Sequence, residues 1–172
     1  MGVEMDEQRN FRDALGAFAT GVTIVTATTP QGERLGVTAN SFNSVSLDPP
    51  LVLVSLARNL RSFQAFEQAT HFAVNLLTRQ QQDLCMRFAR PGQEKWTGLA
   101  AEQGVTGAPL IPGRLAHFEC STWARYDGGD HLILVGQVQG YAGPVEEEPL
   151  IYFRGSFPGL QGAPFKQEMK HA

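Results

Sequence analysis

The feature that most restricts the fold is the pair of prolines in Asp48–Pro50, which separates two segments of strand-like composition. A proline has no backbone N–H group and has a fixed φ angle, so two in succession end any strand or helix that reaches them. After this break, Leu51–Val54 is a continuous apolar run, the pattern of a strand buried on both faces. Before it, Val45 and Leu47 alternate with serines. The stretch Leu35–Leu56 therefore predicts short strands with a forced break between them.

Small polar residues stand on both sides of this break. The segment Gly36–Ser41 (GVTANS) reads as a strand whose end lets backbone amides and hydroxyls approach a flat ligand. After the apolar run, Ala57–Ser62 (ARNLRS) places an arginine and a serine where a strand gives way to a helix. Free amides at a helix start, together with an arginine, favour a phosphate group. Taken singly, these residues are more simply explained as an exposed strand face or, for Asn59, as a helix cap.

Periodicity and turn residues predict the remaining elements. A first helix is expected from Phe11 to Thr20–Gly21, with its apolar face packed on a barrel, and a second over Asn59–Gln68. A third helix is expected after Thr78, where Gln81 completes a capping box. Its buried side is formed by Leu84, Cys85 and Phe88. Strands are expected at Val22–Ala27 and Leu35–Asn40 as one hairpin, at His71–Leu77, at Leu115–Tyr126 and His131–Val138 joined by the turn Asp127–Asp130, and at Leu150–Phe153. Short strands, mostly joined as hairpins with helices between them, predict a mainly β fold: an antiparallel barrel with helical additions.

The segment from Pro91 to Gly113 has little periodicity and is long for a plain loop. Its length favours a functional role such as covering a ligand. Trp96, inside it, is interpreted as a packing residue.

Bulk properties exclude several classes of protein. A length of 172 residues without a low-complexity linker predicts one domain, and a net charge of −3 gives no nucleic-acid footprint. No apolar run is long enough to span a membrane, and the polar, acidic start is unlike a signal peptide, so the expected location is the cytoplasm. Two cysteines without CxxC spacing and four single histidines favour neither a disulfide framework nor a metal site. Neither GxGxxG nor GxxxxGK[ST] is present, so any nucleotide cofactor is held without a Rossmann fingerprint or a P-loop.

The most specific motifs are TANSF at 38–42 with SVSLDPP at 44–50, and Gly-Asp-His at 129–131 followed by Gly-Gln-Val at 136–138. With these motifs the chain resembles the short-chain flavin reductases, the reductase components of two-component flavin-dependent monooxygenases, from about residue 11 to residue 157. The resemblance implies an FMN-binding split β-barrel that forms a homodimer with the flavin near the subunit interface. The domain is therefore expected at 11–157, with residues 1–10 as a flexible N-terminus and the Gly/Pro-rich, basic residues 158–172 as a tail. The implied activity is that of an NAD(P)H:flavin oxidoreductase that supplies reduced flavin to a partner monooxygenase.

The candidate site residues follow from the motifs and the resemblance together. Small residues are expected to border the flavin ring, Arg61 and Ser62 to hold its phosphate, and His131 to contact the nicotinamide as the candidate catalytic residue. We predict that Arg61→Ala costs about 1.5–3 kcal/mol of flavin affinity, the range for hydrogen bonds to charged groups. The complete set of predicted cofactor-binding residues is Thr38, Ala39, Asn40, Ser41, Ser55, Leu56, Ala57, Arg61, Ser62, Phe63, Phe88, Arg90, Gly129, Asp130, His131, Tyr152 and Arg154.

Several alternatives stay open at this level. A flavin-binding electron carrier or sensor would keep the features of residues 38–62 but would not need the Gly-Asp-His turn. A pyridoxamine-phosphate-oxidase-like enzyme on the same barrel ranks last, because no cluster of arginines and lysines marks a second phosphate. The segment 153–157, FRGSF, is less basic than is usual in the family, which puts phosphate contacts from Arg154 in doubt. The sequence does not choose between FMN and FAD or between NADH and NADPH.

Overall fold

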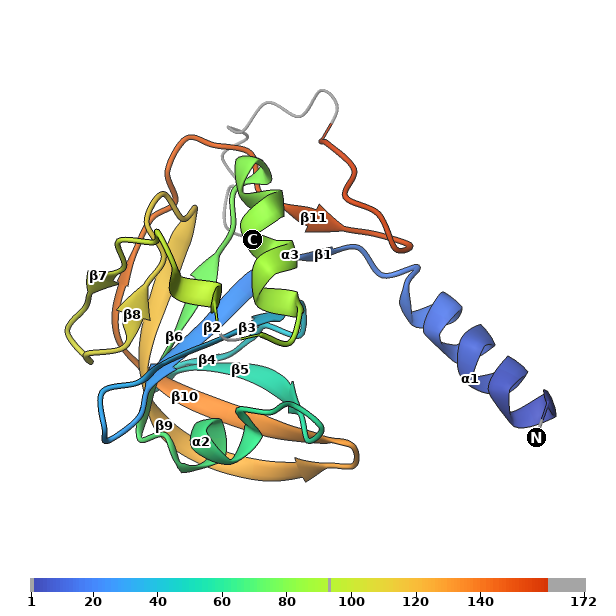
Figure 1. Cartoon of the computed structure of the whole chain (residues 1–172), viewed down its shortest axis with the longest axis horizontal. Coiled ribbons are helices and arrows are strands. Elements are labelled where there is room, and N and C mark those ends of the chain that lie inside the picture. The colour runs from blue at the N-terminus through green and yellow to red at the C-terminus, as the bar shows by residue number, and fades with distance from the viewer. Residues whose placement is uncertain (1, 93, 161–172) are drawn as a thin grey trace.

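The computed structural model describes residues 2–92 and 94–160. Within these residues the centre of the molecule is a seven-stranded sheet in the order β3-β2-β6-β9-β10-β5-β4 (Figure 1), and each neighbouring pair is antiparallel. The sheet curves so strongly that β3 comes back into contact with β5. The prediction of a mainly β, antiparallel fold is confirmed. The strands of this sheet are β2 (Thr23–Thr28), β3 (Arg34–Ala39), β4 (Asn43–Leu47), β5 (Pro50–Ala57), β6 (His71–Leu76), β9 (Ala116–Gly128) and β10 (His131–Ala142).

Smaller elements surround the main sheet. Two short pairs stand outside it: β1 (Thr20–Gly21) with β11 (Ile151–Tyr152), and β7 (Glu102–Gln103) with β8 (Pro109–Leu110). The helical elements are α1 (Gly2–Leu15), α2 (Phe63–Gln68), α3 (Gln82–Ala89) and the 3-10 turns η1 (Arg79–Gln81) and η2 (Glu94–Trp96).

The sheet buries apolar residues on both of its faces. One core contains Phe66 of α2 together with Phe72 and Leu56 from the strands, and the other lies beneath α3 around Phe88. Strand β2 serves both, because its Val25 faces the first core and its Ile24 the second. The hairpin of β2 and β3 is confirmed, and its alternating first strand is buried on both faces rather than on one.

Strand β5 departs from the prediction made for its apolar run. Its burial alternates, with Val52, Val54 and Leu56 buried and Leu51 and Leu53 only partly covered. The expectation of a strand buried on both faces is therefore wrong. The continuous apolar sequence arises because one face of β5 packs in the core and the other face is apolar but open. Sequence periodicity alone cannot distinguish this arrangement from a strand buried on both faces.

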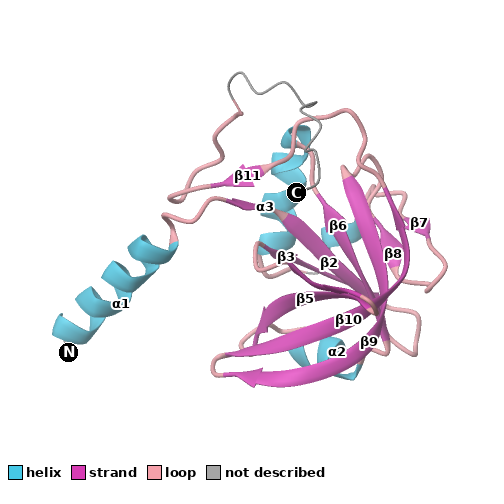
Figure 2. Ribbon diagram, turned by 180° about the vertical axis from the view of Figure 1, so that it is seen from behind, coloured by secondary structure: helices cyan, strands magenta, loops and turns pink. Residues whose placement is uncertain are grey.

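Helix α1 is longer than predicted and lies elsewhere. It begins at Gly2 and ends at Leu15, so it passes through the expected boundary at residue 10 and stops before Thr20–Gly21. Instead of packing on the sheet it projects away from it (Figure 2), and the side chains of Phe11, Leu15 and Phe18 are exposed. The helix has the predicted apolar residues, but among the described residues no other part of the chain packs against them.

The other predicted boundaries shift by a few residues. Helix α2 begins at Phe63 rather than at Asn59, so Asn59 is not its cap, because residues 58–61 form turns. The capping box of Thr78 and Gln81 is confirmed, and it starts a 3-10 turn that leads into α3. The long hairpin is also confirmed and turns at Gly129–Asp130. The expected last strand pairs as β11 with β1, outside the main sheet.

The segment 91–113 packs against the sheet through buried charges. Glu119 of β9 accepts hydrogen bonds from the amide and hydroxyl of Thr106, at 3.0 and 3.1 Å, and a Cβ atom at Gly104 would overlap the Glu119 carboxylate. Arg114 Nε donates to His117 Nδ1 at 2.8 Å, and Arg114 also pairs with Glu102. These contacts tie the segment to β9 and explain why a long stretch without periodicity is ordered.

This cluster makes the stability of the fold depend on pH. Burial, and then the charge of Arg114, lower the pKa of His117, while Glu119 and Glu102 oppose the shift. His117 therefore binds a proton more readily in the unfolded chain than in the folded chain. The free energy of unfolding consequently falls as the pH falls below about 6.5, the ordinary pKa of histidine. The slope from this group is at most about 1.4 kcal/mol per pH unit, the limit for one proton. Urea unfolding between neutral and mildly acidic pH measures it, and a slope in His117→Gln equal to that of the wild type would contradict the assignment.

Candidate functional site

A cavity of about 410 Å³ opens between the end of β3 and the outer pair β1–β11. This volume is within the ordinary range of small-molecule sites. Thr38, Ala39 and Asn40 line one side of it and Tyr152 the other, with Met86 of α3 also in the wall. The structure thus brings together three residues of the TANSF motif and one residue from the end of the domain, as predicted.

The hydroxyls at this cavity are already engaged. Thr38 Oγ1 donates to the carbonyl of Cys85 at 2.7 Å, which attaches β3 to α3, and Thr23 Oγ1 donates to the carbonyl of Ala39 at 2.7 Å. The proton of the Thr38 hydroxyl is therefore committed to that carbonyl, and only the oxygen lone pairs are left for a ligand. Because β3 ends at Ala39 and β4 begins at Asn43, the amides of residues 40–42 lie outside the sheet pairing. These amides and the exposed Asn40 side chain are the polar groups offered to a ligand edge.

Ser41 connects the cavity to the neighbouring strand. Its Oγ accepts from the amide of Ser55 at 2.9 Å and donates to the carbonyl of Ser55 at 3.1 Å. A single hydroxyl thereby pairs the chain at the β3–β4 crossing with β5. Ser41 and Ser55, 14 positions apart in sequence, are thus direct neighbours in the structure.

The register of β5 and β10 places a second group of predicted residues on one face. Ala57 pairs with His131 and Ser55 pairs with Ile133, and directly paired residues of antiparallel strands point to the same side. Leu56, between them, points to the opposite side and is 1% exposed in the core. Its side chain therefore cannot contact a ligand in this structure, although its backbone lies in the strand that carries the site.

His131 stands at the tip of the β9–β10 hairpin, directly after Gly129 and Asp130. Its Nδ1 atom lies 2.7 Å from Asp130 Oδ1. A carboxylate only accepts hydrogen bonds, so Nδ1 carries the proton and Nε2 is left for another partner. The hydrogen bond to His131, and then its charge, lower the pKa of Asp130. Asp130 is thereby kept ionised as an acceptor for the ring.

Arg58 is a residue of this region that sequence reasoning missed. Its Nε donates to the carbonyl of Gly129 at 3.0 Å, its Nη2 pairs with Asp127 at 2.7 Å, and its guanidinium lies 5.5 Å from the ring centre of Phe63. In the sequence it reads only as one of two basic residues at a helix start. Nothing in the linear pattern reveals that the hairpin tip, about 70 residues later, comes to lie against it.

The predicted phosphate residues lie at the start of α2. Arg61 is exposed, Ser62 precedes the helix without a capping hydrogen bond from its side chain, and Phe63 is the first helical residue. With six residues α2 is shorter than the helix expected there. The contribution of the helix to anion binding is correspondingly smaller than the sequence suggested.

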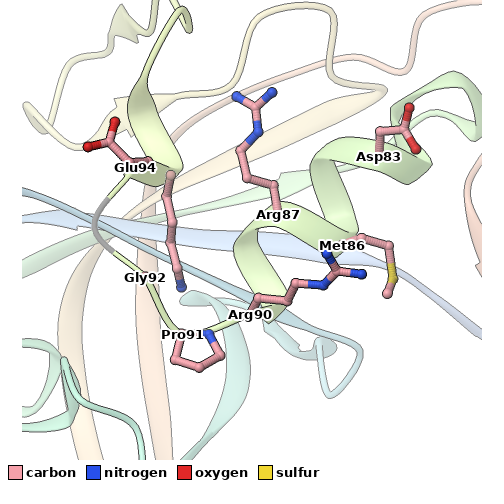
Figure 3. Close-up of a pocket in the computed structure, with 8 residues that line it drawn as sticks. Asp83, Met86, Arg87, Arg90, Pro91, Gly92 and Glu94 are labelled. Carbon is pink, nitrogen blue, oxygen red and sulfur yellow. The ribbon is translucent and has the colours of Figure 1, made fainter.

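Three further predicted residues do not line the cavity themselves, although Ala89 and Gly155, which are next to them in the chain, do. Phe88 is 0% exposed and packs edge-on against Trp96 at 5.0 Å, so its side chain belongs to the core, and Trp96 is confirmed as a packing residue. Arg90 lines a separate cavity of about 500 Å³ on the outer side of α3 (Figure 3), with Arg87 and Lys95. Arg154 is exposed and has a φ of 47°, in a turn where its amide donates to the carbonyl of Gly16. The segment 91–113 borders the second cavity and does not cover the first.

The described ranges 2–92 and 94–160 contain neither a metal-binding cluster nor a membrane-spanning helix. No group of three or more histidine, cysteine or acidic side chains there could hold a metal ion. No helix in the same ranges has both the length and the apolar character needed to cross a bilayer.

The fold and motifs have known relatives. Residues 15–161 match the family described as flavin reductase like domain, and the chain belongs to that family. It is 50% identical over 152 residues to an FMN reductase (NADH) of Agrobacterium fabrum, covering 88% of this chain and 86% of the relative. It is 44% identical to the reductase component of a trigonelline monooxygenase of Acinetobacter baylyi, covering 87% of this chain but only about half (48%) of that relative.

A solved structure has the same fold. The NADH:FAD oxidoreductase SgcE6 of Streptomyces globisporus, in complex with NAD and FAD fragments, superposes with a TM-score of 0.85 at 35% identity, covering 94% of this chain and 96% of its own. The predicted family is confirmed, and the predicted activity class agrees with the activities for which these relatives are named.

Proposed function

We propose that this protein is a flavin reductase that oxidises NADH and reduces FMN or FAD. The observation that carries the proposal is the linkage, through Ser41 and Ser55, of the cavity at residues 38–40 to the sheet face that bears Ala57 and His131. Hydride transfer from a nicotinamide to a flavin is chemistry that the two cofactors supply themselves. The protein has to bind both, align them and exclude competing reactions. NADH is preferred in the proposal because two of the relatives are named for it.

The residues of the chain divide this work. The backbone amides of residues 40–42 are placed to donate to the polar edge of a flat ring, and small side chains leave room for that ring. His131, held through Nδ1 by Asp130, presents Nε2 for a hydrogen bond with the carboxamide of the nicotinamide, which offers both a donor and an acceptor. Arg61 and Ser62 are proposed to bind the flavin phosphate, as a charge-assisted contact.

The phosphate assignment gives a prediction for flavin affinity. We expect Arg61→Ala to weaken FMN binding by about 10-fold, the lower end for hydrogen bonds to a charged group, because Arg61 is exposed. Fluorescence titration of flavin with the variant measures this change. Arg79→Ala is the matched control, since Arg79 is an exposed arginine on a different part of the molecule. Equal affinities of the wild type and Arg61→Ala would remove Arg61 from the site.

One assay separates the proposed activity from its alternative. Purified protein is mixed with NADH and an excess of free FMN or FAD, and nicotinamide oxidation is followed by absorbance. Turnover that requires added flavin supports a reductase. Tight yellow protein without turnover would instead identify a flavin-binding electron carrier or sensor and would overturn the proposal.

We further propose that the protein acts as a homodimer. The open face of β5 and β10 carries Leu51, Leu53 and Ile133 in continuity with His131, and Leu47 beside it is 94% exposed. Contiguous exposed apolar surface of this kind is typical of a protein interface. Light scattering of the wild type and of Leu47→Glu tests the proposal. A monodisperse monomer at micromolar concentration would contradict it.

The partner and location follow from the same proposal. The reduced flavin would pass to a separate flavin-dependent monooxygenase, as expected for a chain similar to a monooxygenase reductase component. A cytoplasmic location is supported by Cys85 and Cys120, which are buried, unpaired thiols of the kind that reducing compartments maintain.

A further inference from the structure

We propose that Arg58 is a positioning residue that fixes the Gly129–His131 hairpin tip against the start of α2 and thereby sets the place of His131. The inference rests on the proposed function, because it assigns a role in nicotinamide binding. Arg58 belongs to none of the motifs that predict the site. It joins two segments that lie about 70 positions apart in the chain.

The contacts of Arg58 converge on the hairpin tip from three directions. Its backbone amide donates to the carbonyl of Asp130 at 2.9 Å, which continues the pairing of β5 with β10 by one residue. Its Nε donates to the carbonyl of Gly129 at 3.0 Å, and its Nη2 binds Asp127 at 2.7 Å. The guanidinium therefore binds the turn at Asp127 and at Gly129, whose φ is 73°, and the backbone amide of Arg58 binds it at Asp130.

The strand pairing of His131 with Ala57 and Gly128 fixes the backbone at the base of the turn, and the side chain of Arg58 adds the contacts to the turn itself. Residues 127–130 are exposed, and Asp130 makes its hydrogen bond to the adjacent His131, so that bond moves with the hairpin. The other side of Arg58 lies over the ring of Phe63, 5.5 Å from its centre. Arg58 thus links the position of His131 to the start of α2, where the proposed phosphate-binding residues lie.

The exposed ion pair between Arg58 and Asp127 would not by itself be enough to position His131. Arg58 and Asp127 are 39% and 80% exposed at their side chains, and such pairs contribute little to stability. The bond to a backbone carbonyl and the stacking on Phe63 restrict the guanidinium in addition, and a planar fork with several donors is suited to that task. We therefore expect an effect on alignment rather than on folding.

The decisive experiment is a double-mutant cycle of Arg58→Gln and His131→Ala, read as KM for NADH, kcat and FMN affinity. We expect Arg58→Gln to raise KM for NADH by about 10-fold, the lower end of effects for residues that orient a ligand-binding side chain. FMN affinity should stay within about 2-fold of the wild type, the usual scatter for a residue outside the binding contacts. In the His131→Ala background the same change should have almost no further effect, because the residue it positions is gone.

Three comparisons complete the test. Arg58→Lys should have a KM for NADH between those of the wild type and Arg58→Gln, since a lysine can reach only one of the two acceptors. Arg79→Gln, at the exposed pair with Glu148, should leave KM unchanged. If Arg58→Gln does not fold, Asp127→Asn replaces it in the cycle, with an expected rise in KM of about 3-fold, the size for one exposed pair. Equal effects in both backgrounds, or a loss of FMN affinity as large as the rise in KM, would overturn the inference. A wild-type protein that does not oxidise NADH would overturn the proposed function instead.

Discussion

Replacement of His131 by alanine is expected to lower kcat/KM for NADH by about 100-fold, the cost of losing the alignment of two reactants. His131 lies at the hairpin tip with Nδ1 bound to Asp130 at 2.7 Å, so its Nε2 is the ring nitrogen left to bind a ligand. Binding of oxidised FMN should be unchanged, because His131 does not line the cavity at residues 38–40. Steady-state oxidation of NADH and a separate flavin titration measure the two quantities.

Two variants make this prediction specific. His131→Gln keeps a hydrogen-bonding side chain and should recover part of the loss, whereas His71→Ala, at an exposed histidine that begins β6, should have no effect on kcat/KM. If FMN affinity fell in His131→Ala while KM for NADH stayed constant, the assignments of the two cofactors would have to be exchanged.

Replacement of Phe88 by alanine is expected to destabilise the fold by about 3–5 kcal/mol, the range for a fully buried phenylalanine. Phe88 is 0% exposed, packs edge-on with Trp96, and covers Gly36, where a Cβ atom would overlap its ring. Domains of this size have a net stability of only about 5–15 kcal/mol, so the variant loses a large share of it. Urea unfolding followed by tryptophan fluorescence gives the change.

This result would also decide between two roles for Phe88. The resemblance placed it near the flavin, but the structure places its side chain in the core beneath α3. Val105→Ala is the control, since Val105 is 79% exposed and surface substitutions rarely exceed about 0.5 kcal/mol. An unchanged unfolding midpoint together with weaker FMN binding would return Phe88 to the site.

The sequence motifs were informative where function depends on the local backbone. A strand ending in small residues, a break imposed by two prolines and a Gly-Asp turn before a histidine were all read from neighbouring positions. Each is present: β3 ends at Ala39, β5 begins at Pro50, and the hairpin turns at Gly129–Asp130. These features are predictable because turn chemistry and proline geometry act over a few residues.

The errors arose where a residue's role depended on what packs against it. The Thr38 hydroxyl donates to the carbonyl of Cys85, and Phe88, predicted both on the buried side of its helix and near the flavin, has its side chain in the core. The apolar face of α1 was assigned to the barrel, yet Phe11 and Leu15 are exposed. In each case the side-chain chemistry was right and the partner was wrong, because periodicity identifies an apolar or polar face without identifying its neighbour.

The sequence by itself determined the class of fold and the family, and it pointed to the two stretches proposed to form the site, since these depend on local backbone preferences and on short motifs. The tertiary structure decided which hydroxyls remain for a ligand, which face of β5 stays open, and that Arg58 grips the turn before His131. The physical reason is that the register of β5 with β10, and the curvature that brings β3 against β5, are properties of the whole sheet. Contacts between residues about 70 positions apart are fixed only when that sheet has formed.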